Sequence, residues 1–303
     1  MVSPPPIRLI ARETELERLQ QSFVAACHDE PQLIFVTGEA GIGKTALVDV
    51  FLQQIAADET VWIGQGQCVE AYGTREAYLP LLEILRQLCR GMRGDQVLER
   101  LQREAPSWLL QMPALLPQAT YRALQQQYGG ATQDRMLREL AEAIESLTTT
   151  SPLLLVVEDL QWSDTATIDW LNFMGNRRMR ARLLIIVTYR LMEAMQQEHP
   201  IDRISRELQR RGRAVELRLD YLTAPGVAAY LAQRFECHTF PARLIQILTQ
   251  LSTSGNPFFV VTVVEELIRQ GHFVQNDDHW AFVGDIDAVG RRLPYCVQYL
   301  IES

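Results

Sequence analysis

The chain has 303 residues, 47% of them hydrophobic and 22% charged, a mixture that can bury the core of one large or two ordinary domains. Its formal net charge of -8 argues against a broad basic surface, so we expect no direct nucleic-acid contact by this segment. The nearest approach to a basic patch, which we interpret as a solvated helix end before a buried strand, is Arg177, Arg178, Arg180 and Arg182.

The spacing of the cysteines and the length of the apolar runs indicate the cellular compartment of the protein. Five cysteines are scattered without a C-x-x-C pair, which predicts neither a disulfide framework nor a zinc site. No apolar run approaches the ~18 residues that a membrane-spanning helix needs, and the first residues do not resemble a signal peptide. We therefore expect no membrane association and a cytoplasmic location.

Five apolar, β-branched runs predict buried strands, at residues 33–37, 61–68, 153–159, 183–189 and 215–219. Continuous apolar runs are typical of a parallel sheet that is covered on both faces. Helical patterns at 46–57 and 165–174 follow the first and third runs, and Ser163 or Asp164 is expected to cap the latter helix. Strands that alternate with helices predict a doubly wound α/β domain.

A long insertion, residues 69–150, separates the second predicted strand from the third. Helices are expected in it at 79–88, 96–103 and 134–147. Three prolines are expected to break its middle into short pieces: Pro106, Pro113 and Pro117.

Beyond residue 222 the pattern is helical, which predicts a lid-like second domain. The expected helices are at 224–235, 243–251 and 259–270. A hairpin is expected to turn at 276–278, between short runs at 273–274 and 280–283. We therefore divide the chain into an α/β domain (1–222), a helical lid (223–272) and a terminal segment (273–303).

The segment from Gly38 to Thr45 reads G-E-A-G-I-G-K-T and matches the phosphate-loop pattern G-x-x-x-x-G-K-[ST] between a predicted strand and helix. Glycines let the backbone curl so that N–H groups and a helix N-terminus face phosphate oxygens. Lys44 would bind the β and γ phosphates, and the Thr45 hydroxyl would bind Mg²⁺. The expected phosphate-binding residues are Gly38, Glu39, Ala40, Gly41, Ile42, Gly43, Lys44, Thr45 and Ala46.

Acidic side chains end the third predicted strand. Glu158 and Asp159 would emerge at its carboxyl end, where ligands bind in open α/β sheets. One acid would bind Mg²⁺ and the other would orient or deprotonate the attacking water. The sequence does not decide which of the two acids has which role. The alternative without chemistry is a strand-end turn before a capped helix.

Arg190 ends the fourth predicted strand. It would reach the γ-phosphate if that strand lies between the first and the third, and otherwise it is an ordinary exposed arginine. Lys44 is the only lysine, so the N-K-x-D loop that recognises guanine is absent. We therefore predict that the bound base is adenine.

Three segments carry a resemblance to a known family. They are L-I-A-R-E-T-E-L at 9–16, E-D-L-Q-W-S-D at 158–164 and G-N-P-F-F at 255–259. With the phosphate loop they resemble the STAND class of P-loop ATPases (signal-transduction ATPases with numerous domains). The similarity is to the AAA-like ATPase modules of large bacterial transcriptional regulators of the maltose-activator-like, LuxR type, and of related cyclases and kinases. Ala11 stands where the family usually has glycine.

The resemblance implies a sheet of order 5-1-4-3-2, with Ile10 and Arg12 beside the adenine and Pro257 packed on it. It also implies an ATP-binding module that slowly hydrolyses ATP to ADP and phosphate and acts as a switch, with ATP between the α/β core and the lid. Members assemble when ATP is bound and carry fused sensor or effector domains. Residues 273–303 resemble the start of a winged helix, so we expect a fragment of a longer protein involved in signal transduction or transcriptional regulation.

Two other functions stay open on the sequence. One is a module that holds ADP or ATP without useful hydrolysis, which the paired acids Glu158 and Asp159 argue against. The other is a small-molecule kinase with the same phosphate loop, which the segments at 158–164 and 255–257 disfavour.

Overall fold

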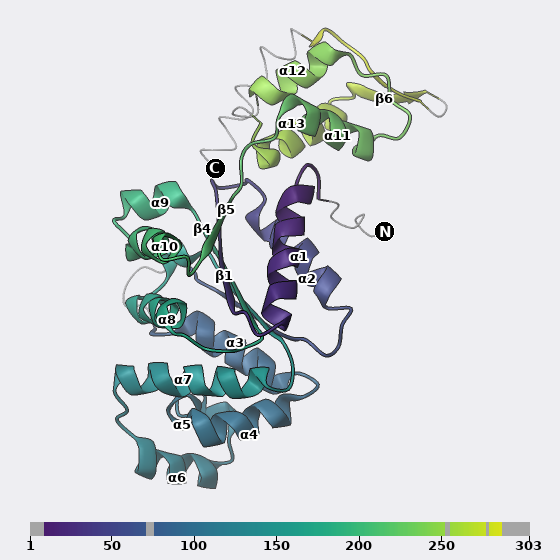
Figure 1. Ribbon diagram of the computed structural model, residues 1–303. Coiled ribbons are helices and arrows are strands. Elements are labelled where there is room, and N and C mark those ends of the chain that lie inside the picture. The colour runs from purple at the N-terminus through teal and green to yellow at the C-terminus, as the bar shows by residue number, and fades with distance from the viewer. Residues whose placement is uncertain (1–8, 71–75, 252–254, 277–278, 287–303) are drawn as a thin grey trace. The chain divides into compact units, whose positions relative to one another are not determined.

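The computed structural model describes residues 9–70, 76–251, 255–276 and 279–286 (Figure 1). The chain folds as two compact units. The sheet unit contains residues 17–38 and 51–218. The helical unit contains the described residues among 1–16, 39–50 and 219–303.

The sheet unit is built on five parallel strands in the order β2-β3-β4-β1-β5. Their bounds are β1 (Gln32–Thr37), β2 (Trp62–Gln67), β3 (Leu153–Glu158), β4 (Leu183–Tyr189) and β5 (Val215–Arg218). This order, read from the other edge, confirms the predicted 5-1-4-3-2. All seven residues of β4 are buried, as a central strand covered on both faces requires.

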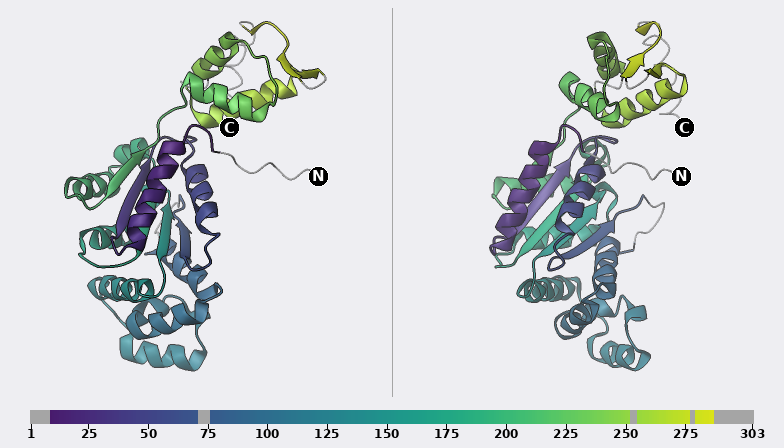
Figure 2. Two further views of the ribbon diagram at one scale, coloured as in Figure 1. Left: turned by 45° about the vertical axis from the view of Figure 1, so that its right-hand side comes forward. Right: turned by 90° about the vertical axis from the view of Figure 1, so that its right-hand side faces the viewer.

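Helices cover both faces of this sheet (Figure 2). The helices α8 (Thr165–Asn176) and α10 (Pro200–Arg210) lie on one face, and the sheet-unit residues of α1 (Glu13–Cys27) lie on the other. Asp164 caps α8, because its Oδ1 accepts a hydrogen bond from the Thr167 N–H at 2.9 Å. Of the two predicted caps, Asp164 is therefore the one used.

The insertion between β2 and β3 is helical, as expected. It comprises α3 (Leu79–Arg90), α4 (Gly94–Glu104), α5 (Pro106–Leu109), α6 (Gln118–Tyr128) and α7 (Gln133–Thr148), with a 3₁₀ turn at Pro113–Leu115. Its apolar side chains continue the core of the sheet. Trp108 is fully buried there and donates a hydrogen bond from Nε1 to the Met136 carbonyl oxygen at 2.7 Å.

Five of the helices in the described part of the chain were not predicted from the sequence. They are α1, α5, α6, α10 and the short α9 (Leu191–Gln196). Helix α10 begins with Pro200 at its first turn and buries Ile201, Ile204 and Leu208 on one side. Helix α6 buries none of its residues fully, so its sequence has no continuous apolar stripe.

The helical unit has its own core. Helices α11 (Ala224–Arg234), α12 (Ala242–Leu251) and α13 (Pro257–Arg269) pack with a hairpin of β6 (Phe273–Asn276) and β7 (His279–Phe282). Phe235 stacks on Phe273 with ring centroids 4.7 Å apart. The remaining element, α2 (Lys44–Ile55), follows the phosphate loop. The predicted turn residues 277–278 and winged-helix start lie outside the described residues.

Within the described part of the chain, no helix combines the length and the apolar composition needed to cross a bilayer.

The second strand contains two glycines because α3 crosses it closely. A Cβ on Gly66 would lie 2.1 Å from the Pro80 carbonyl oxygen, which belongs to the backbone of α3. A Cβ on Gly64 would lie 2.7 Å from the Ile84 Cγ2 methyl group, which a change of rotamer can move. Gly66 is therefore the position at which the helix requires glycine.

We predict that Gly66→Ala lowers the free energy of unfolding by about 3 kcal/mol, the upper end of the usual overpacking penalty. Gly64→Ala, its matched control on the same strand, lowers it by about 1 kcal/mol because the neighbouring methyl group can shift. Urea unfolding of both variants measures the difference. Equal losses would contradict the assigned role of the Pro80 backbone.

Candidate functional site

The phosphate loop follows β1 directly. Gly38 lies in the sheet unit at the edge where the parallel strands end, and residues 39–45 belong to the helical unit. Gly41 and Gly43 adopt φ angles of 74° and 97°, which glycine reaches without steric cost. Lys44 opens α2 and is 7% exposed, whereas Thr45 is exposed.

The carbonyl oxygens of loop residues 39–42 all accept hydrogen bonds within the helical unit. In loop order, the donors are Lys44 Nζ (2.9 Å), Asn256 Nδ2 (2.9 Å), the Phe258 N–H (3.2 Å) and Arg12 Nη2 (3.3 Å). Carbonyl lone pairs repel an anion, so the capture of three of them by donors outside the loop suits a loop that presents N–H groups to phosphate. This arrangement fits the phosphates of a nucleotide.

Each residue of the G-N-P segment has a separate task. A Cβ on Gly255 would lie 2.0 Å from the Leu222 carbonyl oxygen, so only glycine permits this approach. Asn256, 3% exposed, caps α13 by accepting the Phe258 N–H at its Oδ1 (3.1 Å) while its Nδ2 holds the Ala40 carbonyl. Pro257 occupies the first turn of α13, where its missing N–H costs nothing.

The L-I-A-R-E segment also reaches the loop. Arg12 is 6% exposed and forms an ion pair with Glu15 at 3.1 Å, in addition to its bonds to the Ile42 and Asp220 carbonyl oxygens. Ala11, at the position of the family's glycine, has a φ of 53°, so the glycine preference reflects a left-handed backbone. Ile10 is half-buried.

The Tyr221 side chain also contacts the loop, at Glu39. The Tyr221 hydroxyl donates a hydrogen bond to the Glu39 carboxylate, and this bond raises the pKa of Tyr221 above its ordinary value. Tyr221 and Glu39 both belong to the helical unit.

The acidic pair lies in the sheet unit. Glu158 ends β3, and Asp159 follows it with a φ of 55°. The Asp159 N–H donates to Thr188 Oγ1 on β4 at 3.0 Å. Its carboxylate accepts hydrogen bonds from Gln161 (3.2 Å) and Gln67 (3.4 Å), so three side chains at this end of the sheet hold Asp159 in place.

Arg190 lies beside this acid. Strand β4 lies between β1 and β3, as the predicted approach of Arg190 to the γ-phosphate requires. Its Nε is 3.9 Å from Asp159 Oδ1, its Nη1 is 2.7 Å from Glu193, and its guanidinium carbon is 4.9 Å from the Trp162 ring centroid. The guanidinium is therefore held between two carboxylates and an aromatic face.

The predicted site residues thus form two groups. The helical unit contains those of the loop together with Ile10, Arg12 and Pro257, and the sheet unit contains Gly38, Glu158, Asp159 and Arg190. Among the described residues, no three His, Cys, Asp or Glu side chains gather as a metal site. Magnesium keeps most of its waters and takes one or two carboxylates, so a hydroxyl and an acid fit it.

The structure adds residues that sequence reasoning missed. Gln67, Gln161 and Thr188 hold Asp159, and Tyr221 and Asn256 hold the loop. Gln161 and Asn256 lie inside the family-like segments, so those segments were a signal for them. Thr188 and Gln67 stand at strand ends, and only the strand order identifies them as neighbours of Asp159.

Residues 8–187 match the family model for the AAA ATPase domain, more than half of the chain. A curated relative, an uncharacterised protein of Rhizobium meliloti (strain 1021), is 25% identical over 191 residues, which are 60% of this chain and 18% of that protein. The chain thus spans less than a fifth of the length of the curated relative that it matches.

Solved structures share the fold. A Walker-type ATPase of Pyrococcus abyssi aligns with a TM-score of 0.54 and 16% identity over 97% of this chain and 74% of that chain. Cdc6p from Pyrobaculum aerophilum aligns at 0.52 and 15% over 89% and 65%. Drosophila ORC bound to DNA aligns at 0.51 and 14% over 98% and 64%. At these identities the likeness shows the fold alone.

We predict that the contact between Asn256 and Ala40 supports nucleotide binding separately from the helix cap. Asn256→Ser keeps a capping oxygen but is too short to reach Ala40, and Asn256→Ala loses both bonds. The alanine variant unfolds about 1 kcal/mol more easily than the serine variant. Both variants bind ATP about tenfold more weakly, because the Ala40 carbonyl loses its donor.

Thermal melting and titration with a fluorescent ATP analogue measure the two effects. A serine variant with unchanged affinity would show that the loop does not need this donor.

Proposed function

Because the chain belongs to the AAA ATPase domain family, we propose that it is the ATP-binding and slowly ATP-hydrolysing switch module of a larger STAND-class protein. The parent protein acts in signal transduction or transcriptional regulation. One observation carries this proposal: the phosphate loop belongs to the same compact unit as the helices beyond residue 219, and Asn256 and Phe258 bond to its backbone. A ligand on the loop therefore acts directly on the helical segment, as a switch requires.

In this proposal the loop binds ATP through its N–H groups from Gly38 to Ala46. The Lys44 ammonium, which bonds to the Glu39 carbonyl oxygen at 2.9 Å, transfers to the β and γ phosphates. Ile10, Arg12 and Pro257 lie beside the adenine, as the family resemblance implies. Arg12 also keeps its bond to the Ile42 carbonyl, so the base and the loop share one buried arginine.

For hydrolysis we assign the chemistry to the two acids and the neighbouring arginine. Glu158 and Asp159 supply the carboxylates that bind Mg²⁺ and activate water. Thr45 and one of the acids would hold Mg²⁺, which would supply neutralising charge to the phosphates. Arg190 pairs with Glu193 through Nη1 at 2.7 Å, and the other donors of its guanidinium remain to contact a phosphate. We take contact between Arg190 and the γ-phosphate as the signal that distinguishes ATP from ADP.

The proposal extends to partners. ATP-bound copies assemble into a homo-oligomer, and fused sensor or effector domains read the nucleotide state in the cytoplasm. The family resemblance supports both points. The small share of the curated relative that this chain spans fits a longer parent protein.

We predict that Lys44→Ala weakens ATP binding about 100-fold, because it removes a charged contact to phosphate. Arg18→Ala, which removes an exposed positive charge from α1, is the control for net charge and leaves affinity unchanged. Titration calorimetry measures both variants. Retained affinity in Lys44→Ala would refute the proposed nucleotide site.

We predict that Glu158→Gln and Asp159→Asn each release phosphate from ATP about 100-fold more slowly than the native protein, the usual size of an acid–base contribution. A phosphate-release assay at saturating ATP compares the three proteins, and ATP titration confirms that the variants still bind. Equal rates in all three would instead support a module that holds ATP or ADP without useful hydrolysis.

A further inference from the structure

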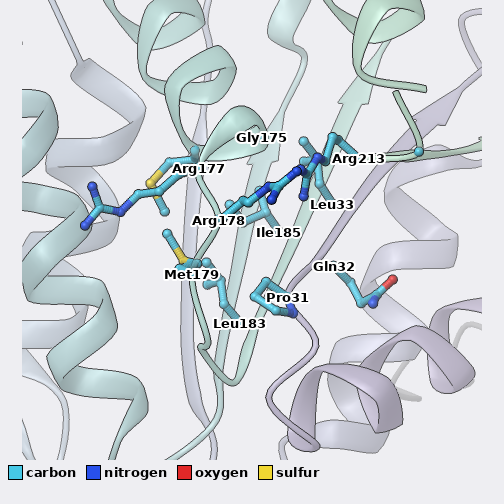
Figure 3. Close-up of a pocket in the computed structure, with 12 residues that line it drawn as sticks. Pro31, Gln32, Leu33, Gly175, Arg177, Arg178, Met179, Leu183, Ile185 and Arg213 are labelled. Carbon is cyan, nitrogen blue, oxygen red and sulfur yellow. The ribbon is translucent and has the colours of Figure 1, made fainter. Parts of the chain in front are cut away.

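A cavity of about 210 Å³ opens in the sheet unit where β1 and β4 begin (Figure 3). Because the strands are parallel, this edge is opposite the one where Glu158 ends β3. Its apolar lining includes Leu33 of β1, Ile185 of β4, and Met174 and Met179 at and beyond the end of α8. The ATPase proposal uses none of these residues.

Three arginines line the same cavity, and they come from two segments. Arg178 follows α8 and Arg213 follows α10, and Figure 3 shows their side chains extending toward one another. Arg177 points away and pairs with Glu145 at 2.7 Å. In the described ranges, neither the Arg178 nor the Arg213 side chain has an ion pair or a hydrogen bond.

Helix dipoles account for part of this arrangement. Cations are favoured beyond helix C-termini, so α8 and α10 each favour an arginine at these positions. The dipoles do not use the guanidinium donors, of which each arginine has five in a planar fork. Arg178 is exposed and Arg213 is half-buried. Two like charges that converge on one cavity repel each other, and a bound anion relieves that repulsion.

We propose that this cavity binds a small organic anion: a carboxylate or phosphate monoester with a compact apolar body. The paired guanidinium groups would bind the charged head with bidentate hydrogen bonds, and Leu33, Ile185 and the two methionines would cover the body. An engineered apolar cavity of about 150 Å³ in another protein holds benzene, so a single ring fits this volume. The site is separate from the phosphate loop and does not depend on ATP hydrolysis.

Titration calorimetry on the Lys44→Ala variant tests the site without interference from the loop. Benzoate and phenyl phosphate are the probes, and they distinguish a carboxylate from a phosphate head. Acetate supplies the charge without the ring, and benzyl alcohol supplies the ring without the charge. We expect at least one of the two ring anions to bind, and acetate and benzyl alcohol to bind at least tenfold more weakly.

The same titrations on three added substitutions locate the binding. Arg178→Gln and Arg213→Gln each weaken it about tenfold, the effect of one lost charge-assisted hydrogen bond. Arg180→Gln, an exposed arginine of the same segment outside the cavity lining, leaves it unchanged. Circular dichroism confirms that the variants are folded. Failure of both ring anions to bind, or equal binding in all three variants, overturns the proposal.

Discussion

The phosphate loop depends on hydrogen-bond donors that come from outside it. A loop that presents N–H groups to an anion turns its carbonyl oxygens away, and a buried carbonyl without a partner costs about 1–3 kcal/mol. Here Asn256, Phe258 and Arg12 supply three of the donors, and Lys44 supplies the fourth from within the loop. Asn256 and Phe258 stand at the start of α13, whose Val260, Val263 and Val264 lie in the core of the helical unit. Arg12 also bonds to the Asp220 carbonyl oxygen of the same unit. The loop conformation is therefore a property of that whole unit.

The sequence predicted the sheet well because its three central strands, β1, β3 and β4, are nearly continuous apolar runs. Strand β4 is buried at every position, so its apolar run has the same bounds as the strand, at residues 183–189. Helix α6 was missed because none of its residues is fully buried, so no apolar periodicity shows in its sequence. Helix α10 has such a stripe and begins with Pro200 in its first turn, where proline is tolerated, but no helix was assigned to this segment from the sequence.

Only part of the candidate site could be predicted from the sequence, because some of its residues are close in the fold but distant in the chain. The phosphate loop, Gly38 to Thr45, is one contiguous segment, and the acidic pair is another. Phosphate binding requires the residue types found in both segments. The residues that hold them are distant in the chain: Thr188 and Gln67 meet Asp159 only through strand order. Arg12 was expected beside a base, and its bonds to two backbone carbonyls depend on a fold that residue types do not reveal.

The contacts of the phosphate loop give its variable positions different tolerances for substitution. In G-x-x-x-x-G-K-[ST] the second and third variable residues are Ala40 and Gly41. The Asn256 side chain donates a hydrogen bond to the backbone carbonyl oxygen of Ala40. Because every amino acid has this carbonyl group, the bond does not constrain the side chain at position 40. A Cβ at 41 would lie 2.7 Å from the Phe258 Cβ, and φ there is 74°, so glycine is required. Positions 40 and 41, which the motif treats alike, thus differ in their tolerance for substitution: position 40 accepts other side chains and position 41 does not. The bond to Ala40 instead requires the asparagine at residue 256.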